Sequence, residues 1–448
     1  MSEISYSAEK RGVFMSESYE VVEKLLGDFF ERHTAGDKAG MSEVLQKLQM
    51  MLYSGDVDST PFKDYFNSMY TGRSAINVTG MMQDYPRESI IRELLQNVFG
   101  CDYEENDIKV MIEFLDEGQV KLTYNETGFS LEQVFYYLSV GRNEGIAERE
   151  GRFGLGAKSV FANVDWFKMR SNNYSLRVVN DGGTLKVREL ELNGPKFNHT
   201  EIVFGLDDEG QKKLHHNLVT MTSEKGDYMN MVDLCFAFIR KKHLKATDTQ
   251  ETPSRTFNIA IISFGKPEVV YKIQEFRRDE NDLPKVRFFE NGKSVADFIH
   301  MENDGFVYLI PFAISGAKRE AARVLMQKYN YFSTFELTGL VKANRQAFLQ
   351  EQLSAFFVSV PNKYITNNRA GIRHDSVEEV SAEIEKDIVD IVERYKKLFV
   401  LELVQRPDNA ERYMLRPRQY VFEFFYNYIN TSTLVKGLKE KFCDNISV

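Results

Sequence analysis

The chain has 448 residues, enough for two or three domains with a sizeable core. Its 57 basic and 66 acidic side chains give a formal net charge of −9, which argues against a broad basic face for duplex nucleic acid and leaves a local basic patch open. The three cysteines, Cys101, Cys235 and Cys443, lie far apart without a C-x-x-C pair, which argues against a disulfide framework and a thiolate zinc site.

The first predicted elements are helical. Residues 15–55 carry apolar side chains at helical spacing, interrupted by the glycine-containing stretch 34–40. This pattern predicts a pair of helices followed by a looser segment, all within a helical N-terminal extension over residues 1–80. Pro86 then opens a predicted helix that runs through Phe99, because the missing N–H of proline would be unpaired in a first turn anyway.

From Ile108 the pattern changes to the alternation typical of strands with one buried face, over residues 108–114 and 120–124. A glycine-rich segment at 151–156 follows. The alternation then returns in runs at 166–169, 175–179, 184–188 and 201–204. We therefore expect an α+β sandwich domain over residues 81–210.

The second half begins with a charged, helical connector over residues 211–255, whose polar end from 245 is the best candidate for a domain boundary. A second α/β domain is expected over residues 256–400. Its predicted elements are strands at 259–264 and 355–360 and a long helix from Val377.

The C-terminal tail, residues 401–448, is rich in phenylalanine and tyrosine. We expect a helical tail whose aromatic side chains are core, since Phe and Tyr at helical spacing are normally buried, although a protein-binding surface stays open. The predicted fold class is thus α+β: a sandwich domain and a second α/β domain, with a helical N-terminal extension and C-terminal tail.

Glu93 and Asn97 are the first candidate site residues. They stand four residues apart in the predicted helix after Pro86 and so lie on one helical face. The carboxylate can polarise an attacking water, and the amide oxygen can bind a magnesium ion that keeps several of its waters. Such a pair is more often simply a solvated helix face.

The second candidate is the segment 125–129, which follows a predicted strand. Gly128 allows a tight turn there, and Glu126 can accept a hydrogen bond from an exocyclic amino group. By itself this segment also fits an ordinary turn at the end of a strand.

The third candidate is the glycine-rich segment 151–159, whose backbone N–H groups can approach phosphate oxygens at the start of a helix. It is not a Walker A loop, because Ala157 stands where a glycine should precede the lysine, and Ser159 breaks the dinucleotide-binding pattern. A flexible surface loop is the alternative. The fourth candidate is the small hydroxyl of Thr200, just before a predicted strand.

In this order the four segments resemble the nucleotide-binding domain of the GHKL superfamily, which includes gyrases, 90-kDa heat-shock chaperones, histidine kinases and mismatch-repair ATPases. Within it the chain looks most like heat-shock-chaperone-like proteins of the sacsin and No-Vein type. Residues 91–97 are similar to the first family box, 151–161 to the glycine-rich lid box, and 200–202 to the last box.

The resemblance implies a Bergerat-type fold and assigns roles to these residues. Glu93 would be the general base, Asn97 the magnesium ligand, Glu126 the counterpart of the adenine-reading aspartate, and Thr200 a neighbour of the adenine. The pocket and lid would be shaped by Gly128, Gly151, Arg152, Phe153, Gly154, Leu155, Gly156 and Lys158. Ser130 and His199 stand where the family usually has glycines.

A fifth segment, residues 360–373, resembles the middle-domain catalytic loop of the 90-kDa chaperones, whose arginine reaches the γ-phosphate. That arginine falls on Arg369, and a guanidinium can bind and neutralise the transferring phosphoryl group. Lys342 is a second candidate for phosphate contact. The alternative is that Arg369 and Arg373 are surface charges near a turn.

These motifs predict an ATPase that binds ATP and Mg²⁺, hydrolyses ATP slowly and switches conformation. The loop 139–156 would close as a lid, and Arg369 would arrive when the second domain docks. The expected partners are ATP, ADP and a protein partner or a second copy of the chain. The absence of a signal-peptide pattern and of any run of 18 apolar residues predicts a cytoplasmic protein without membrane contact.

Two alternatives stay open. One is a catalytically weak nucleotide-binding scaffold for a protein partner, in which Glu126, Ser130 and His199 mark decay of the site. The other is a GHKL ATPase that acts on nucleic acid, although the acidic charge and the lack of a recognisable DNA-cleaving domain do not indicate nucleic acid.

Overall fold

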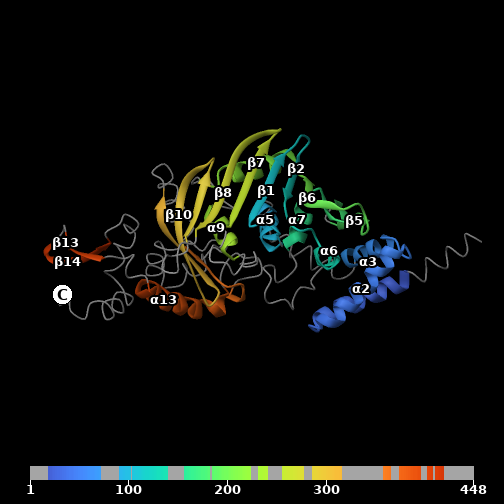
Figure 1. Ribbon diagram of the computed structural model, residues 1–448, viewed down its shortest axis with the longest axis horizontal. Coiled ribbons are helices and arrows are strands. Elements are labelled where there is room, and N and C mark those ends of the chain that lie inside the picture. Colours follow the sequence, from blue (N-terminus) through green and yellow to red (C-terminus); the bar gives the residue numbers. More distant parts are fainter. Residues whose placement is uncertain are drawn as a thin grey trace, which may run out of the picture. The chain divides into compact units, whose positions relative to one another are not determined.

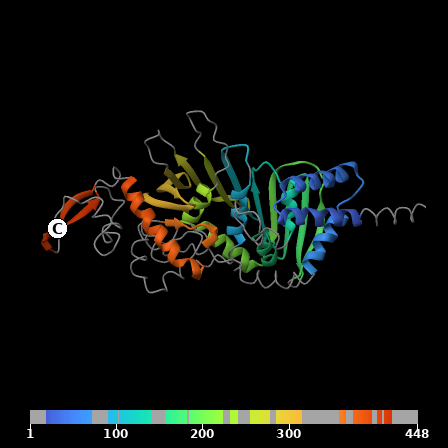
Figure 2. The same cartoon turned by 90° about the horizontal axis from the view of Figure 1, so that it is seen from below.

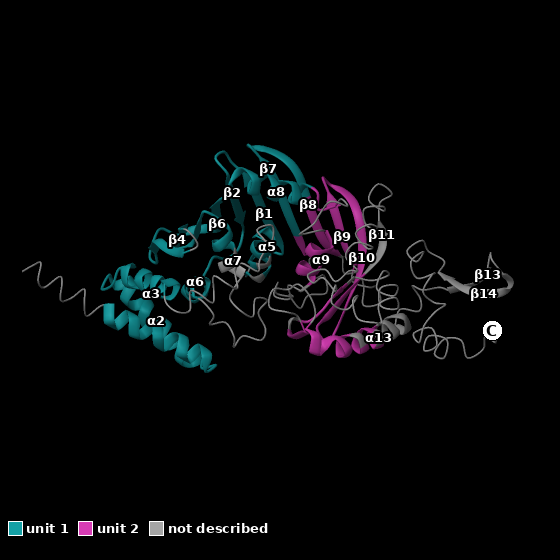
Figure 3. Cartoon of the chain, turned by 180° about the vertical axis from the view of Figure 1, so that it is seen from behind, with its two compact units in different colours: residues 1–219, 243–246, 257–270 teal, residues 220–242, 247–256, 271–448 magenta. Residues whose placement is uncertain are grey.

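The chain is a mixed α+β protein with two compact units, shown in Figure 3. Unit 1 comprises residues 1–219, 243–246 and 257–270, and unit 2 the rest. The computed structural model describes residues 19–71, 90–101, 103–139, 156–181, 184–222, 231–240, 255–276, 285–314, 357–364, 373–394, 401–406 and 409–417. Across those residues, no helix is both long and apolar enough to span a membrane.

Unit 1 begins with helices, as predicted. A helix over residues 19–34 is followed by α2 (Lys38–Ser54). The carboxylate of Asp37 caps α2 by accepting a hydrogen bond from the N–H of Gly40 at 2.9 Å, and Gly55 ends it in the left-handed conformation. The glycine-containing stretch thus separates two helices.

The looser segment expected after this pair is wrong in part, because α3 (Thr60–Thr71) is a helix. Asp58 accepts a hydrogen bond from the N–H of Thr60 at its start. The buried side chains of Phe62, Phe66 and Tyr70 recur every four residues along α3, a spacing that favours a helix.

The strands of unit 1 are those expected from the alternation. They are β1 (Asp107–Phe114), β2 (Gln119–Tyr124), β3 (Trp166–Asn172), β4 (Tyr174–Asp181), β5 (Thr184–Glu191) and β6 (Phe197–Gly205). Their order is β1-β2-β6-β3-β4-β5, with antiparallel neighbours. β7 (Thr256–Ser263), which the sequence analysis places in the second domain, lies beside β1 in unit 1. One buried row on β2 consists of Val120, Leu122 and Tyr124.

Helices of unit 1 bring the candidate motifs to this sheet. These helices are α5 (Ile90–Gly100), α6 (Leu131–Leu138), α7 (Gly156–Asn163) and α8 (Asp208–Val219). Figures 1 and 2 show α5 and α7 side by side against one face of the sheet, and the two helices pack on each other. The helix that carries Glu93 and Asn97 therefore lies next to the helix that begins at Gly156.

The helix α6 has different neighbours on its different sides. Phe135 contacts Phe29 and Phe66 of the N-terminal helices, with ring centroids 5.8 and 5.9 Å away. Tyr137 instead contacts Phe161 of α7 at 5.6 Å and Phe167 of β3 at 6.0 Å. α6 is thus shared between the N-terminal helices and the sheet domain.

The edge strand β5 is covered by α3. The side chain of Asn67 donates to the carbonyl of Val187 at 3.1 Å and accepts from its N–H at 2.8 Å, as a neighbouring strand would. The hydroxyl of Ser59 accepts from the N–H of Leu192 at 3.1 Å. Asn67 thus pairs the backbone groups of Val187, so at this residue β5 does not present a free hydrogen-bonding edge.

Unit 2 contains an antiparallel meander, which begins within β8 (Lys266–Phe276). It continues through β9 (Lys285–Glu290), β10 (Lys293–Asn303), β11 (Phe306–Ile314) and β12 (Phe357–Ser359). The unit also has the helices α9 (Met231–Arg240) and α13 (Val377–Arg394) and the short 3-10 helices Asn362–Tyr364 and His374–Ser376. The strands predicted near 259–264 and 355–360 and the helix from Val377 are confirmed.

The helical tail is wrong over residues 401–417. There β13 (Leu401–Arg406) and β14 (Asn409–Pro417) pair as an antiparallel hairpin. Pro407 and Asp408, which stand between the strands, are residues typical of turns. The aromatic run from Tyr420 lies outside the described residues.

Candidate functional site

Glu93 lies on α5 and is buried, with 2% of its surface exposed. Its Oε1 lies 3.6 Å from Nε of Arg92, which is also largely buried. Asn97, one turn later, has a buried amide nitrogen with no hydrogen-bond partner in the part of the chain that the structure describes. The two residues are therefore not a solvated helix face, and the amide of Asn97 is left for another partner.

Glu126 and Thr200 meet in the interior. Thr200 on β6 pairs in register with Tyr124 on β2, and Glu126 follows two residues after Tyr124. The Thr200 hydroxyl donates a hydrogen bond to Oε1 of Glu126. Both residues are buried, with 0% and 4% of their surface exposed. Sheet pairing thus joins two candidates from separate motifs.

Ser171 extends this contact, and sequence reasoning missed it. Its Oγ lies 2.5 Å from Oγ1 of Thr200 and accepts a hydrogen bond from the N–H of Phe129 at 2.9 Å. The register of β3 with β6 shifts between Arg170 and Asn172, a bulge that lies at Ser171. In the sequence, Ser171 is a polar residue at a position of β3 where the alternation predicts a buried apolar side chain, and this could have drawn attention to it.

Gly128 has the backbone conformation that the tight turn requires, with φ of +94°. A Cβ atom at this position would lie 2.9 Å from Cβ of Asn172, so only glycine fits without a shift. Asn172 in turn donates from its side chain to the carbonyl of Phe129 at 3.3 Å. The loop that carries Glu126 is therefore held against β3 by Phe129, just after Gly128, and against β6 by Glu126, just before it.

The charge of Glu126 acts on two buried tyrosines, Tyr124 and Tyr137. Burial raises the pKa of Tyr124 well above its usual value, and the negative charge of Glu126 raises it further. Burial also raises the pKa of Tyr137, and the nearby Glu126 carboxylate raises it further. The thiol of Cys101 donates to the carbonyl of Asn97 at 3.1 Å, so the end of α5 reaches the same neighbourhood. Both phenols stay protonated at neutral pH.

The two departures from the family pattern have local explanations. Ser130 caps α6: its Oγ accepts from the N–H of Gln133 at 3.2 Å, and the Gln133 side chain accepts from the N–H of Ser130 at 2.7 Å. The ring of His199 packs on Phe197 with centroids 4.2 Å apart. Because side chains alternate along a strand, His199 points away from the face that carries Thr200.

Several predicted site residues fall outside the described residues: Gly151, Arg152, Phe153, Gly154, Leu155, Arg369 and Lys342. Gly156 is the first residue of α7. The side chain of Lys158 is also outside what the structure describes. The structure therefore brings together Glu126 and Thr200 and places Gly128 in their loop, with Glu93 and Asn97 on the neighbouring helix α5.

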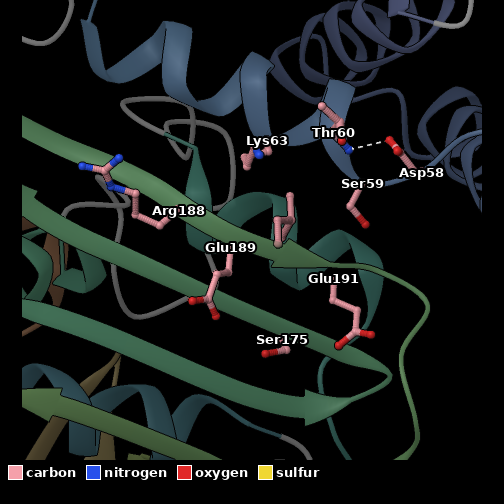
Figure 4. Close-up of a pocket in the computed structure, with 9 residues that line it drawn as sticks. Asp58, Ser59, Thr60, Lys63, Ser175, Arg188, Glu189 and Glu191 are labelled. Atoms are coloured by element: carbon pink, nitrogen blue, oxygen red, sulfur yellow. Dashed lines mark hydrogen bonds between the residues drawn. The ribbon is translucent and has the colours of Figure 1, made fainter. Parts of the chain in front are cut away.

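An open hollow elsewhere in unit 1 contains none of these residues. It lies between the start of α3 and the strands β4 and β5 (Figure 4), and its charged lining consists of Asp58, Lys63, Arg188, Glu189 and Glu191. Because both charge signs line it, it does not indicate an anion site. Among the residues that the structure describes, no group of three or more His, Cys, Asp or Glu side chains could hold a metal ion.

No protein-family model matches the chain, and no curated protein matches it either. The functional assignment therefore rests on the residues above and on their geometry.

Proposed function

We propose that the chain is an ATP-binding, slowly ATP-hydrolysing conformational switch of the GHKL type. The observation that carries the proposal is the buried hydrogen bond from Thr200 to Glu126, residues 74 positions apart. In the resemblance these are the two residues expected at the adenine. A chance match of separate motifs would not require them to share one hydrogen bond.

Glu93 is proposed as the general base. A carboxylate buried beside Arg92 is held in place and shielded from bulk water, both of which suit a group that orients one water for attack. Asn97 is proposed to hold Mg²⁺ through its amide oxygen, the kind of ligand that this ion prefers, from a position one helical turn after Glu93 on α5. When bound, the ion would neutralise charge on the phosphates while keeping most of its waters.

Slow turnover suits this function. A machine whose output is a change of shape needs a nucleotide state that lasts long enough for a protein partner or second copy to respond. In the proposal Arg369, brought by the second domain, completes the site for hydrolysis. A cytoplasmic location and the absence of nucleic acid among the partners belong to the same proposal.

The test is Mg²⁺-dependent ATP hydrolysis and ATP binding measured in parallel on wild type and Glu93→Gln. Removing the base should lower kcat by about 10²- to 10⁴-fold, with ATP affinity within about threefold of wild type. Glu43→Gln, an exposed carboxylate on α2, is the matched control and should change neither. Arg369→Ala should also lower kcat without loss of binding.

Three other results would overturn parts of the proposal. Hydrolysis that survives in Glu93→Gln would remove Glu93 as the base. ATP binding without turnover, with or without Mg²⁺ and candidate partners, would favour the nucleotide-binding scaffold. A wild-type chain that binds no nucleotide would refute the proposed function altogether.

A further inference from the structure

Among the residues that the structure describes, two buried tyrosine hydroxyls near Glu126 have no hydrogen-bond partner. They belong to Tyr124, with 1% of its surface exposed, and Tyr137, with 8% exposed. Two other tyrosines buried in unit 1, by contrast, have hydrogen-bonded hydroxyls. Tyr70 donates to the carbonyl of Leu138 at 2.7 Å, and Tyr103 donates to the carbonyl of Val98 at 2.8 Å.

An unpaired hydroxyl in the interior is costly. Leaving a buried polar group without a partner costs about 1 to 3 kcal/mol, so native structures rarely leave two in one place without a reason. The two groups come from separate elements, β2 and α6, and both are close enough to Glu126 for its charge to raise their pKa. Their common neighbour is the proposed nucleotide site.

The side chains of Glu126, Tyr124 and Tyr137 determine which part of a nucleotide can bind beside them. A phosphate would be repelled by the Glu126 carboxylate, whereas an uncharged base would not. Because the two phenols stay protonated, they donate hydrogen bonds, and the carboxylate accepts them. The surroundings of Glu126 therefore offer one acceptor and two donors.

We infer that the hydroxyls of Tyr124 and Tyr137 bind ring nitrogens of the nucleobase directly and, with Glu126, select a 6-aminopurine. In adenine the exocyclic amino group, a donor, is flanked by the acceptors N1 and N7, which is the complementary pattern. A 6-oxopurine places a carbonyl oxygen against the carboxylate instead. This inference rests on the proposed function, because it identifies contacts within that site.

The test uses Tyr124→Phe and Tyr137→Phe, which remove only the hydroxyl. Without nucleotide, each variant should unfold at the same temperature as wild type or higher, because an unpaired buried group is lost. The affinity for ATP and ADP, measured by titration calorimetry, should fall about 3- to 10-fold per variant, the effect of one net hydrogen bond. The already weak affinity for GTP should change by less than twofold.

Tyr70→Phe is the matched control. Its hydroxyl is buried and paired with a backbone carbonyl, so the variant should unfold at a lower temperature and bind ATP as wild type does. A merely structural role for Tyr124 or Tyr137 would give this same result and would overturn the inference.

Deaza nucleotides identify the acceptor and keep the test independent of variant folding. Wild type should bind 1-deaza-ATP or 7-deaza-ATP about 3- to 10-fold more weakly than ATP. Each analogue lacks the ring nitrogen that one of the two tyrosines is proposed to bind. The Phe variant of that tyrosine should bind this analogue as tightly as wild type does. Wild type that binds ATP and both analogues equally would overturn the inference and leave the proposed function standing. Wild type that binds no nucleotide would overturn both.

Discussion

Tyr308 in unit 2 and Tyr124 in unit 1 are both fully buried tyrosines near a carboxylate, but only one of their hydroxyls is paired. Tyr308 on β11 donates to Oδ2 of Asp387 on α13, and Asn303 donates to the other oxygen. Among the described residues, Tyr124 has no such partner. The complete cluster joins β11 to α13, whereas the incomplete one is where we propose that another molecule binds.

The largest effect should come from breaking the complete cluster. Asp387→Ala leaves the buried donors of Tyr308 and Asn303 without an acceptor, so the free energy of unfolding of unit 2 should fall by about 3 kcal/mol. Urea denaturation followed by circular dichroism measures this change. The affinity for ATP should stay that of wild type.

The opposite pattern is expected for Glu126→Ala. It should abolish measurable ATP binding and leave the unfolding of unit 2 unchanged. If Asp387→Ala weakened ATP binding as strongly as Glu126→Ala does, the distinction between the two clusters would be wrong.

An intermediate effect is expected at Gly128. Gly128→Ala must accept a positive φ and also push against Asn172, so unfolding should become easier by about 2 kcal/mol and ATP affinity should drop. Gly36→Ala is the control, because Gly36 has φ of +72° and nothing within 4 Å of a Cβ. It should show the smaller strain alone, about 1 kcal/mol, with no change in ATP affinity. Equal costs at the two glycines would mean that the close approach to Asn172 is unimportant.

The smallest effect is expected at Asn67 in unit 1, whose side-chain amide both donates to and accepts from the backbone of Val187. Asn67→Ala removes both hydrogen bonds to Val187 and should destabilise unit 1 by about 1 kcal/mol without altering ATP binding. Asn193→Ala, which loses a single 3.4 Å bond to the carbonyl of Leu52, should cost less. A loss of ATP binding in Asn67→Ala would contradict the comparison. It would show that a polar group with all its hydrogen bonds made within the protein can also be needed for ATP binding.

The strands of unit 1 could be predicted from sequence because their alternation is regular, as in β1 and β2. α3 could not, because residues such as Asn67 and Ser68 weaken its helical pattern while Phe62 and Phe66 carry its packing. The hairpin at residues 401–417 was missed because the aromatic composition of the tail outweighed the turn residues between its strands.

For the candidate site, the resemblance places Glu126 and Thr200 each near the adenine. It did not predict the hydrogen bond that joins them. Ser171 and Asn172 were not predicted either, because a bulge in β3 positions them and a bulge leaves little local signal. The unpaired hydroxyl of Tyr124 is likewise visible only when every neighbour is in place.

The covering of β5 by α3 has a consequence for the order of folding during synthesis. The hydrogen bonds of Asn67 cannot form until Val187, 120 residues later, has been synthesised. That of Ser59 cannot form until Leu192, 133 residues later, has been synthesised. At translation rates of about 5 to 20 residues per second, these hydrogen bonds of α3 form about 6 to 27 seconds after α3 itself is made. Phe62 and Phe66 pack instead on Phe135 of α6, which is synthesised earlier than β5, so the apolar contacts of α3 can form before its polar contacts with the edge strand.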